Sequence, residues 1–214
     1  MSAQLNAAVR RVVPWLVALV AELPVPLVCV RWGLLLDDRR ENRRNSWGRL
    51  RGPGESARYD AVRRFVEAYG SEGFVLDVGC SQGILQEGLT YRRYLGVDRS
   101  AGAIGLARSR RDDRTDFEVA DASEFRTDER PDVVVLNEVL YYLPEPVRTV
   151  EHYARLVEED GVVVVSVYAH AWSTRRLLRQ IHARLDVVRS TSVQSGEVAW
   201  IVAAFRGRGP VRPG

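Results

Sequence analysis

The chain has 214 residues, 46% of them hydrophobic and 28% charged, and its formal net charge is +3. The length allows one well-packed domain with a small appendage, and the composition is that of an ordinary soluble protein. All 31 basic residues are arginines. Arginine therefore does the work that lysine would share, and its abundance is weak evidence for binding to nucleic acid.

The cysteine and histidine content argues against a zinc finger and against a disulfide-rich secreted scaffold. Cys29 and Cys80 stand far apart, and none of the three histidines has the spacing of a metal finger. Two unpaired thiols fit a reducing compartment, so we expect a cytoplasmic protein.

An apolar stretch from Val12 to Leu36 is the first predicted element, and prolines and charged residues interrupt it. A membrane span needs about 20 uninterrupted apolar residues. A signal peptide needs a small-residue cleavage site after one short apolar core. We expect neither, and interpret the stretch as two short helical pieces that pack on the protein, on a partner subunit as a homodimer contact, or over a substrate as a lid. A helix lying on a membrane surface is the alternative.

Residues 37–51 are polar, and Gly52-Pro53-Gly54 then interrupts the chain. We place a boundary there and expect three parts. These are a helical N-terminal segment over residues 1–54, a core over residues 55–206 and a disordered tail over residues 207–214.

The core begins with apolar residues at helical spacing from Ala57 to Tyr69, and beyond Gly70 strand-like runs alternate with helical stretches. The predicted strands are Phe74–Val78, Arg93–Val97, Asp116–Ala120, Asp132–Leu136 and Val162–Tyr168. The predicted helices between them are Gly83–Leu89, Ala101–Ser109 and Glu145–Glu158, with a short turn at Ala122–Phe125. This alternation is typical of a parallel sheet covered by helices on both faces.

The end of the chain predicts a different arrangement. Residues 171–185 form a helical pattern, and two strands joined at Ser195-Gly196 follow. So tight a connection makes the two strands antiparallel.

Polar or small residues follow the predicted strands at their carboxyl ends, where an open parallel sheet binds ligands. Asp77 precedes a turn with Gly79, Ser81 and Gly83, and these small residues let a ligand approach the backbone. The predicted helix after this turn supplies free N–H donors. Asp98 ends the second strand 21 positions after Asp77, where a carboxylate can hold a ribose diol.

The next two strand ends extend this pattern. The third strand leads to Asp121 and Ala122, and an aspartate there can accept a hydrogen bond from the exocyclic amine of a base. The fourth strand is followed by Asn137, Glu138, Tyr141 and Tyr142. Each strand end alone could be a capping or turn residue, but the four together predict one nucleoside-shaped pocket.

Five motifs resemble, in order and spacing, those of the class I S-adenosylmethionine-dependent methyltransferases: VLDVGCSQG, YLGVDRS, VADASEF, VVLNEVLYYLPEP and GVVVVSVY. The resemblance covers residues 58–205. It implies an α/β fold, a Rossmann-like doubly wound sheet of seven strands with the last one antiparallel, in agreement with the predicted hairpin. It also implies S-adenosylmethionine as the cofactor and S-adenosylhomocysteine as its product.

The resemblance assigns the cofactor's parts to residues of the predicted pocket. Asp77, Gly79 and Gly83 would surround the methionine part. Asp98 would bind the ribose, and Asp121 would bind the adenine amine.

The remaining cofactor residues follow from the same pattern. Ala122 would line the adenine, Asn137 would lie near the sulfonium, and Arg58 and Tyr59 would close over the methionine carboxylate, for which a guanidinium offers paired donors. Ser81 departs from the pattern, which has glycine there. Because serine tolerates a left-handed backbone poorly, we expect an altered turn or a hydroxyl that touches the cofactor.

Methyl transfer from a sulfonium is an in-line displacement, and an alcohol acceptor benefits from a base. The candidate catalytic residues are Glu138, His170 and Tyr142. Glu138 and His170 are the candidate bases, since both follow strand ends that face the same cleft.

Some methyltransferases bind a divalent metal through Glu-x-x-Glu-His after the fourth strand. Tyr141 and Tyr142 occupy the last two of these positions, which argues against a metal such as Mg²⁺.

The stretches ESARYD, NEVLYYLPEP and VSVY together are similar to bacterial sugar and polysaccharide methyltransferases, including the 1-O-methyltransferases of methylmannose polysaccharide synthesis. We therefore expect the acceptor to be a hydroxyl of a sugar or oligosaccharide. The candidate substrate residues are aromatic and suit stacking on sugar faces: Tyr141, Tyr142, Trp32 and Trp172.

The alternative acceptors are an aromatic or other small natural product and, through the Arg39–Arg51 cluster, RNA. The absence of an Asn-Pro-Pro-Tyr motif argues against amino-directed methylation of nucleic acid.

Overall fold

The computed structural model describes residues 52–208, except residues 124, 170 and 171. The expectations about the N-terminal appendage, the Arg39–Arg51 cluster, Trp32, His170 and residues 209–214 therefore lie outside the described residues.

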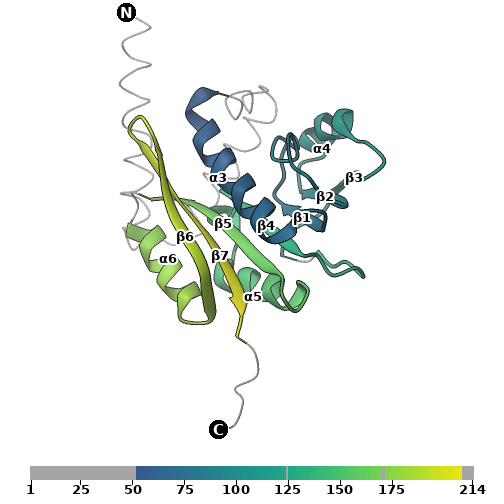
Figure 1. Ribbon diagram of the computed structural model, residues 1–214. Coiled ribbons are helices and arrows are strands. Elements are labelled where there is room, and N and C mark those ends of the chain that lie inside the picture. The colour runs from purple at the N-terminus through teal and green to yellow at the C-terminus, as the bar shows by residue number, and fades with distance from the viewer. Residues whose placement is uncertain (1–51, 124, 170–171, 209–214) are drawn as a thin grey trace, which may run out of the picture.

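A single seven-stranded sheet in the order β3-β2-β1-β4-β5-β7-β6 forms the centre of the molecule (Figure 1). Its strands are β1 (Phe74–Val78), β2 (Arg93–Asp98), β3 (Thr115–Val119), β4 (Val133–Asn137), β5 (Val162–Tyr168), β6 (Leu185–Ser195) and β7 (Val198–Gly207). The first five are parallel where they pair with one another, and β7 is antiparallel to both β5 and β6. The predicted fold class and the C-terminal hairpin are therefore confirmed.

Helices cover both faces of the sheet, because the buried strands present apolar side chains alternately to either side. The helices are α3 (Pro53–Gly70), α4 (Ala101–Ala107), α5 (Pro146–Leu156) and α6 (Trp172–His182), with short 3₁₀ turns η2 (Arg108–Arg110) and η3 (Leu140–Tyr142). Helix α3 and the buried face of α4 pack in one apolar cluster with Val133 and Val135. Helices α5 and α6 pack in the other cluster with Val134 and Leu136. Figure 1 shows α3 on the near side of the sheet, with α5 behind it.

The predicted helix Gly83–Leu89 is wrong, and a series of turns connects β1 to β2 instead. The backbone of Ser81, Gly83 and Gly88 is left-handed, with φ of 50°, 70° and 82°. A right-handed helix cannot pass through such residues. Short-range hydrogen bonds replace the helical ones, such as the bond from Gly83 N to Cys80 O at 3.0 Å.

Arginine side chains satisfy several carbonyl groups that this loop leaves open. The Arg63 guanidinium on α3 donates to Ile84 O at 3.0 Å and to Leu85 O at 3.3 Å. Arg110 donates to Gln82 O at 3.0 Å. The loop is therefore held by defined contacts on both sides, although it contains no helix.

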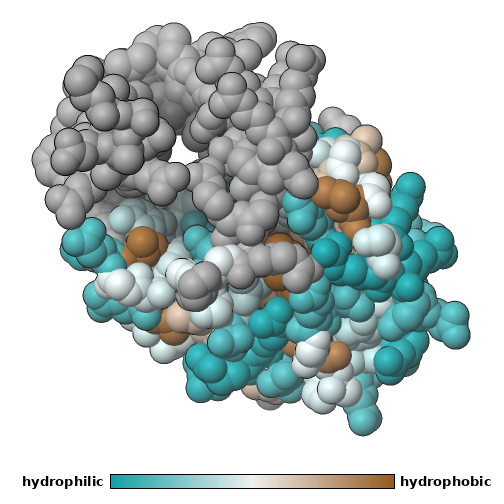
Figure 2. Space-filling model, turned by 90° about the horizontal axis from the view of Figure 1, so that it is seen from above, coloured by the Kyte–Doolittle hydropathy of each residue, from teal (hydrophilic) through white to brown (hydrophobic). Residues whose placement is uncertain are grey.

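Seen from above, the described surface is mostly hydrophilic, with small hydrophobic spots separated by polar residues (Figure 2). None of the described helices has the length and apolar character of a membrane span.

We expect Gly83→Ala to destabilise the protein more than Gly88→Ala does. Both residues have a positive φ, so both variants carry a similar backbone cost of about 1–2 kcal/mol. A methyl group at Gly83 would also meet the Phe117 ring at 2.7 Å, whereas one at Gly88 would meet nothing within 4 Å. Overpacking of this kind costs about 1–3 kcal/mol. Urea unfolding of the two variants measures the difference, and equal midpoints would contradict the packing at Gly83.

Candidate active site

A cavity of about 470 Å³ opens at the carboxyl ends of β1, β2 and β4. Strand β1 pairs with β2 on one side and with β4 on the other, so the strand order reverses at this place. Ligands bind to open α/β sheets at such a switch point. Nine predicted cofactor residues line the cavity: Arg58, Tyr59, Asp77, Gly79, Ser81, Asp98, Asp121, Ala122 and Asn137. The structure also brings Glu138, Tyr141 and Tyr142 to it.

Gly83 is the one predicted cofactor residue that does not line the cavity. Its missing side chain makes room for Phe117. Gly79, by contrast, does line the cavity, and a methyl group there would meet Val139 at 2.0 Å. Glycine is required here for two reasons. The φ of 77° is unfavourable for other residues, and Val139 leaves no room for a side chain.

Asp77 is a buried carboxylate with one oxygen free for a ligand. It is 1% exposed, and the Tyr94 hydroxyl on β2 donates to its Oδ2 at 2.5 Å. Its Oδ1 has no hydrogen-bond partner among the described residues. Burial raises the pKa of Asp77 to about 7, partly offset by the Tyr94 hydrogen bond. A donor or cation in the cavity would therefore satisfy a buried acceptor that the protein itself leaves open.

Ser81 and Asp98 join the loop after β1 to the end of β2. The backbone N–H of Ser81 donates to Asp98 Oδ2 at 2.9 Å, and that of Ser100 donates to Oδ1 at 2.8 Å. Ser81 keeps the left-handed backbone that glycine favours, at a cost of about 1–2 kcal/mol. Its buried hydroxyl has no hydrogen-bond partner among the described residues. The predicted contact of this hydroxyl with a ligand stays a prediction.

The free N–H donors were predicted for a helix after this turn, and residues 83–89 form no helix. The N–H groups of the turn itself are used inside the protein. The N–H groups of Gly79 and Cys80 both donate to Val97 O, at 2.8 and 3.0 Å. The N–H group of Ser81 donates to Asp98. These three N–H groups are therefore already bonded within the protein, and a ligand at the turn would meet side chains instead.

Asp121 presents an ionised carboxylate at the far side of the cavity. The Ser123 backbone N–H and hydroxyl both donate to its Oδ1, at 2.8 and 2.6 Å. These bonds lower the pKa of Asp121 below its usual value. The Tyr153 hydroxyl on α5 donates to Ala122 O at 2.7 Å and so ties this turn to α5.

Arg58 links helix α3 to the end of β4. Its side chain is only 2% exposed, and its guanidinium lies 4.5 Å from the centroid of the Tyr59 ring. The Nε and Nη2 atoms donate to Glu55 Oε2 at 3.1 and 2.7 Å, and Nη1 donates to Asn137 Oδ1. Glu55 lines the cavity too, so a carboxylate already occupies one edge of this guanidinium.

Glu138 follows β4 with a left-handed backbone, at a φ of 59°. Burial raises the pKa of its carboxyl to about 7, although the nearby Arg58 charge lowers it. The Tyr141 hydroxyl lies 3.4 Å from its Oε1. A carboxyl with a pKa near 7 can hold or release a proton at neutral pH, which suits a general base.

Tyr141 and Tyr142 are large and partly exposed at the cavity, with 36% and 41% of their surface accessible. The backbone N–H of Tyr168 donates to the Tyr141 hydroxyl. Tyr141 therefore spans the ends of β4 and β5 beside Glu138.

Sequence reasoning missed several lining residues, among them Glu55, Tyr168, Val198 and Trp200. Trp200 pairs with Tyr168 in the β5–β7 register. Because β7 is antiparallel, its first residues lie at the end where the parallel strands finish. The predicted hairpin turn was the signal that could have placed Val198 and Trp200 at the site.

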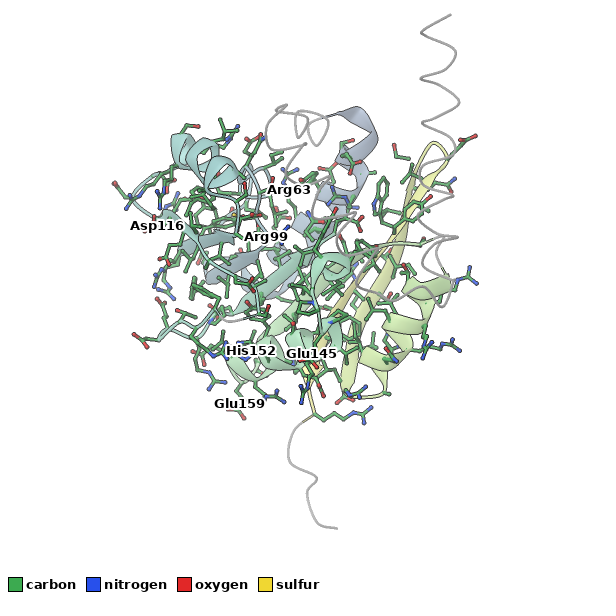
Figure 3. The ribbon with its side chains drawn as sticks, turned by 180° about the vertical axis from the view of Figure 1, so that it is seen from behind. Arg63, Arg99, Asp116, Glu145, His152 and Glu159 are labelled. Atoms are coloured by element: carbon green, nitrogen blue, oxygen red, sulfur yellow. The ribbon has the colours of Figure 1, made fainter. Side chains whose placement is uncertain are left out.

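The described histidines do not line the cavity. His152 on α5 contacts Phe125 O and Arg126, and it lies apart from the cavity residue Arg99 in Figure 3. His182 packs on Phe205, with ring centroids 5.4 Å apart. His170 and the Trp172 side chain are outside the description, so their predicted roles stay predictions. Among residues 52–208 as described, no group of three or more His, Cys, Asp and Glu could hold a metal ion.

Replacing Asp77 with asparagine should change how stability depends on pH. The folded pKa of about 7 exceeds the unfolded value of 3.8, so the folded state binds the extra proton between these values. This contribution is present at low pH and is lost as pH rises through 7. The unfolding free energy of Asp77→Asn, relative to wild type, should therefore rise by about 2–4 kcal/mol from pH 4 to pH 8. Urea unfolding at a series of pH values measures it, with the exposed Asp113→Asn as control. Parallel curves for Asp77→Asn and wild type would contradict the raised pKa.

Comparison with known proteins places this chain in a family. The model of a family described as "Methyltransferase domain" matches residues 42–205. A ubiquinone biosynthesis O-methyltransferase of Aromatoleum aromaticum is 35% identical over 99 residues, which span 43% of this chain and 42% of that relative. The match thus spans less than half the length of that curated relative.

Solved structures share the fold. The N-methyltransferase NodS from Bradyrhizobium japonicum, in complex with S-adenosyl-L-homocysteine, superposes with a TM-score of 0.67 at 24% identity, covering 75% of this chain and 91% of that one. A TehB-like SAM-dependent methyltransferase from Corynebacterium glutamicum gives a TM-score of 0.62 at 20% identity, covering 80% of this chain and 100% of that one. Since the family model spans most of the chain and the fold agrees, the chain belongs to the methyltransferase-domain family, which confirms its resemblance to the class I S-adenosylmethionine-dependent methyltransferases.

Proposed function

We propose that the protein is an S-adenosylmethionine-dependent O-methyltransferase that acts on a hydroxyl of a small acceptor. The observation that carries this proposal is the Glu138 carboxyl. It has a pKa of about 7 and lines the same cavity as the carboxylates at the ends of β1 and β2. A base beside a nucleoside-shaped pocket suits proton removal from an alcohol or phenol.

The cavity fits the proposed cofactor at its amino-acid end. Asp77 Oδ1 and the Ser81 hydroxyl are buried oxygens without hydrogen-bond partners among the described residues, and each can accept a hydrogen bond from an ammonium group. We assign the cofactor's carboxylate to Arg58. We assign its ribose to Asp98 and its adenine amine to Asp121, whose lowered pKa keeps it an acceptor.

Bound S-adenosylmethionine supplies an electrophilic methyl group. The protein's part is to hold the acceptor oxygen in line with that group and to take its proton. Glu138 accepts the proton as the oxygen–methyl bond forms and the sulfur–methyl bond breaks. Tyr141 supports the carboxylate from its Oε1 side.

A sugar or oligosaccharide, such as a mannoside, is the first candidate acceptor. Tyr141, Tyr142 and Tyr168 line the cavity and offer ring faces on which a sugar can stack.

A phenolic small molecule is the second candidate. It is favoured by the likeness to relatives named ubiquinone biosynthesis O-methyltransferases, such as one that is 35% identical over 43% of this chain. The same tyrosine rings can stack on an aromatic acceptor.

Transfer of labelled methyl from S-adenosylmethionine to a panel of saccharides and dihydroxylated aromatics tests the proposal. We expect a product from one of the two panels, and Glu138→Gln should lower kcat by about 10²–10⁴-fold. The pKa of Asp77 is also about 7, so the profile is measured with S-adenosylmethionine saturating. In wild type, kcat/KM for the acceptor should then rise with pH through about 7 and level off, because the base must be deprotonated. The variant should lose this rise.

The exposed Glu145→Gln is the matched control, since Glu145 pairs with Arg148 outside the cavity. It should leave turnover unchanged. Full turnover by Glu138→Gln would show that Glu138 is not the base. No binding of S-adenosylhomocysteine by wild type would contradict the proposed function itself.

Glu55→Gln should tighten the binding of S-adenosylhomocysteine by several-fold. Arg58 Nε and Nη2 donate to Glu55 Oε2 at 3.1 and 2.7 Å. The cofactor's carboxylate must compete with Glu55 for these two donors. A neutral amide competes less well. Calorimetry measures the change, and 5′-methylthioadenosine, which lacks the carboxylate, should bind both forms equally.

Asp60→Asn is the control for this change, because Asp60 pairs with Arg63 at the same spacing on the same helix. It should not alter binding. Weaker binding of S-adenosylhomocysteine to Glu55→Gln would mean that Glu55 orients Arg58 for the ligand and does not compete with it.

A further inference from the structure

Ser166 is a buried hydroxyl in a strand of valines. Strand β5 reads VVVVSVY, and Ser166 is the fifth of its seven residues. Ser166 is 0% exposed and lies in register with Asn137, the last residue of β4. A buried hydroxyl without a hydrogen-bond partner destabilises the folded state, so the partners of Ser166 explain why a polar residue is tolerated there.

The Ser166 hydroxyl bridges two consecutive residues at the end of β4. It donates to Asn137 Oδ1 at 2.6 Å and accepts from the Glu138 backbone N–H at 3.1 Å. The same N–H also lies 3.2 Å from the Ser166 carbonyl oxygen. Both acceptors of the Glu138 N–H therefore come from Ser166.

These bonds act on a strained residue. Glu138 has a φ of 59°, a left-handed conformation that is unfavourable for a residue with a side chain. Strain of this kind persists only where the surroundings enforce it. Asn137 is held in turn by two donors to its Oδ1, the Ser166 hydroxyl and Arg58 Nη1.

We propose that Ser166 is a positioning residue, which holds the end of β4 so that the Glu138 carboxylate stays in the cavity. The proposal rests on the proposed function, in which Glu138 is the base. Ser166 does not line the cavity, so it acts through Glu138 and Asn137.

Other groups face Glu138 and would be unchanged by replacing Ser166. Arg58 and Glu55 approach it from α3, and Tyr141 approaches from η3. A shift in Glu138 titration after a change at Ser166 would therefore report a movement of Glu138 relative to these groups and to solvent.

Ser166→Ala tests the proposal. We expect kcat to fall about tenfold or more, while the dissociation constant of S-adenosylhomocysteine changes less than about threefold, because Arg58 still holds Asn137. The acidic limb of the pH profile, where kcat/KM rises with pH, should move to lower pH. A Glu138 carboxylate that is no longer held in place is better hydrated, and its pKa falls. Carbon-13 NMR of labelled glutamate should show the same direction of shift without any substrate.

Thr115→Val is the matched control. Thr115 also has a buried hydroxyl, bonded to Tyr91 at 2.8 Å, but it begins β3 at the opposite end of the sheet from the cavity. It should lower the melting temperature without moving the acidic limb. Ser166→Thr, which keeps the hydroxyl, should restore the position of the limb. If Ser166→Ala does not fold, Ser166→Cys carries the same comparison, because a thiol of similar shape donates only weakly.

Wild-type kcat and an unmoved limb in Ser166→Ala would overturn the proposal, as would an equal shift in Thr115→Val. Failure of the proposed function is a separate result, since it would show as a wild type that neither binds S-adenosylhomocysteine nor transfers methyl. The NMR titration of Glu138 would then still decide whether Ser166 positions it.

Discussion

The parallel pairing of β1 with both β2 and β4 is the constraint on which the site depends. It sets Asp77 beside Gly96 on one side and Val135 on the other. Carboxyl ends that are distant in sequence therefore meet at one edge of the sheet. Helix α3 completes the arrangement, because Arg58 reaches across to Asn137 at the end of β4.

The charge of the cavity follows from these strand ends. Among the described lining residues, five are acidic and two are arginines. The acidic residues are Glu55, Asp77, Asp98, Asp121 and Glu138. Such a cavity favours a cationic sulfonium over its neutral product, which would aid product release in the proposed reaction. Burial raises the pKa of Asp77 and of Glu138 to about 7, so these two carboxyls add their negative charge to the cavity only above that pH.

Much of the fold and of the cofactor side of the cavity could be predicted, because local patterns determine them. Apolar runs that end at Asp77 and Asp98 identify both the strands and their ends. The segment after β1 could not be predicted from its apolar residues, since the left-handed backbone of Gly83 and Gly88 decides against a helix. Trp200 was missed because a long-range antiparallel pairing brings it to the site.

A crystal structure with bound S-adenosylhomocysteine would show whether the strand ends hold the cofactor. We expect the ribose hydroxyls on Asp98, the amino group within hydrogen-bond distance of Asp77 Oδ1 and the sulfur facing the Glu138 side of the cavity. Ligand bound elsewhere, or bound with Asp77 and Asp98 out of reach, would contradict this expectation.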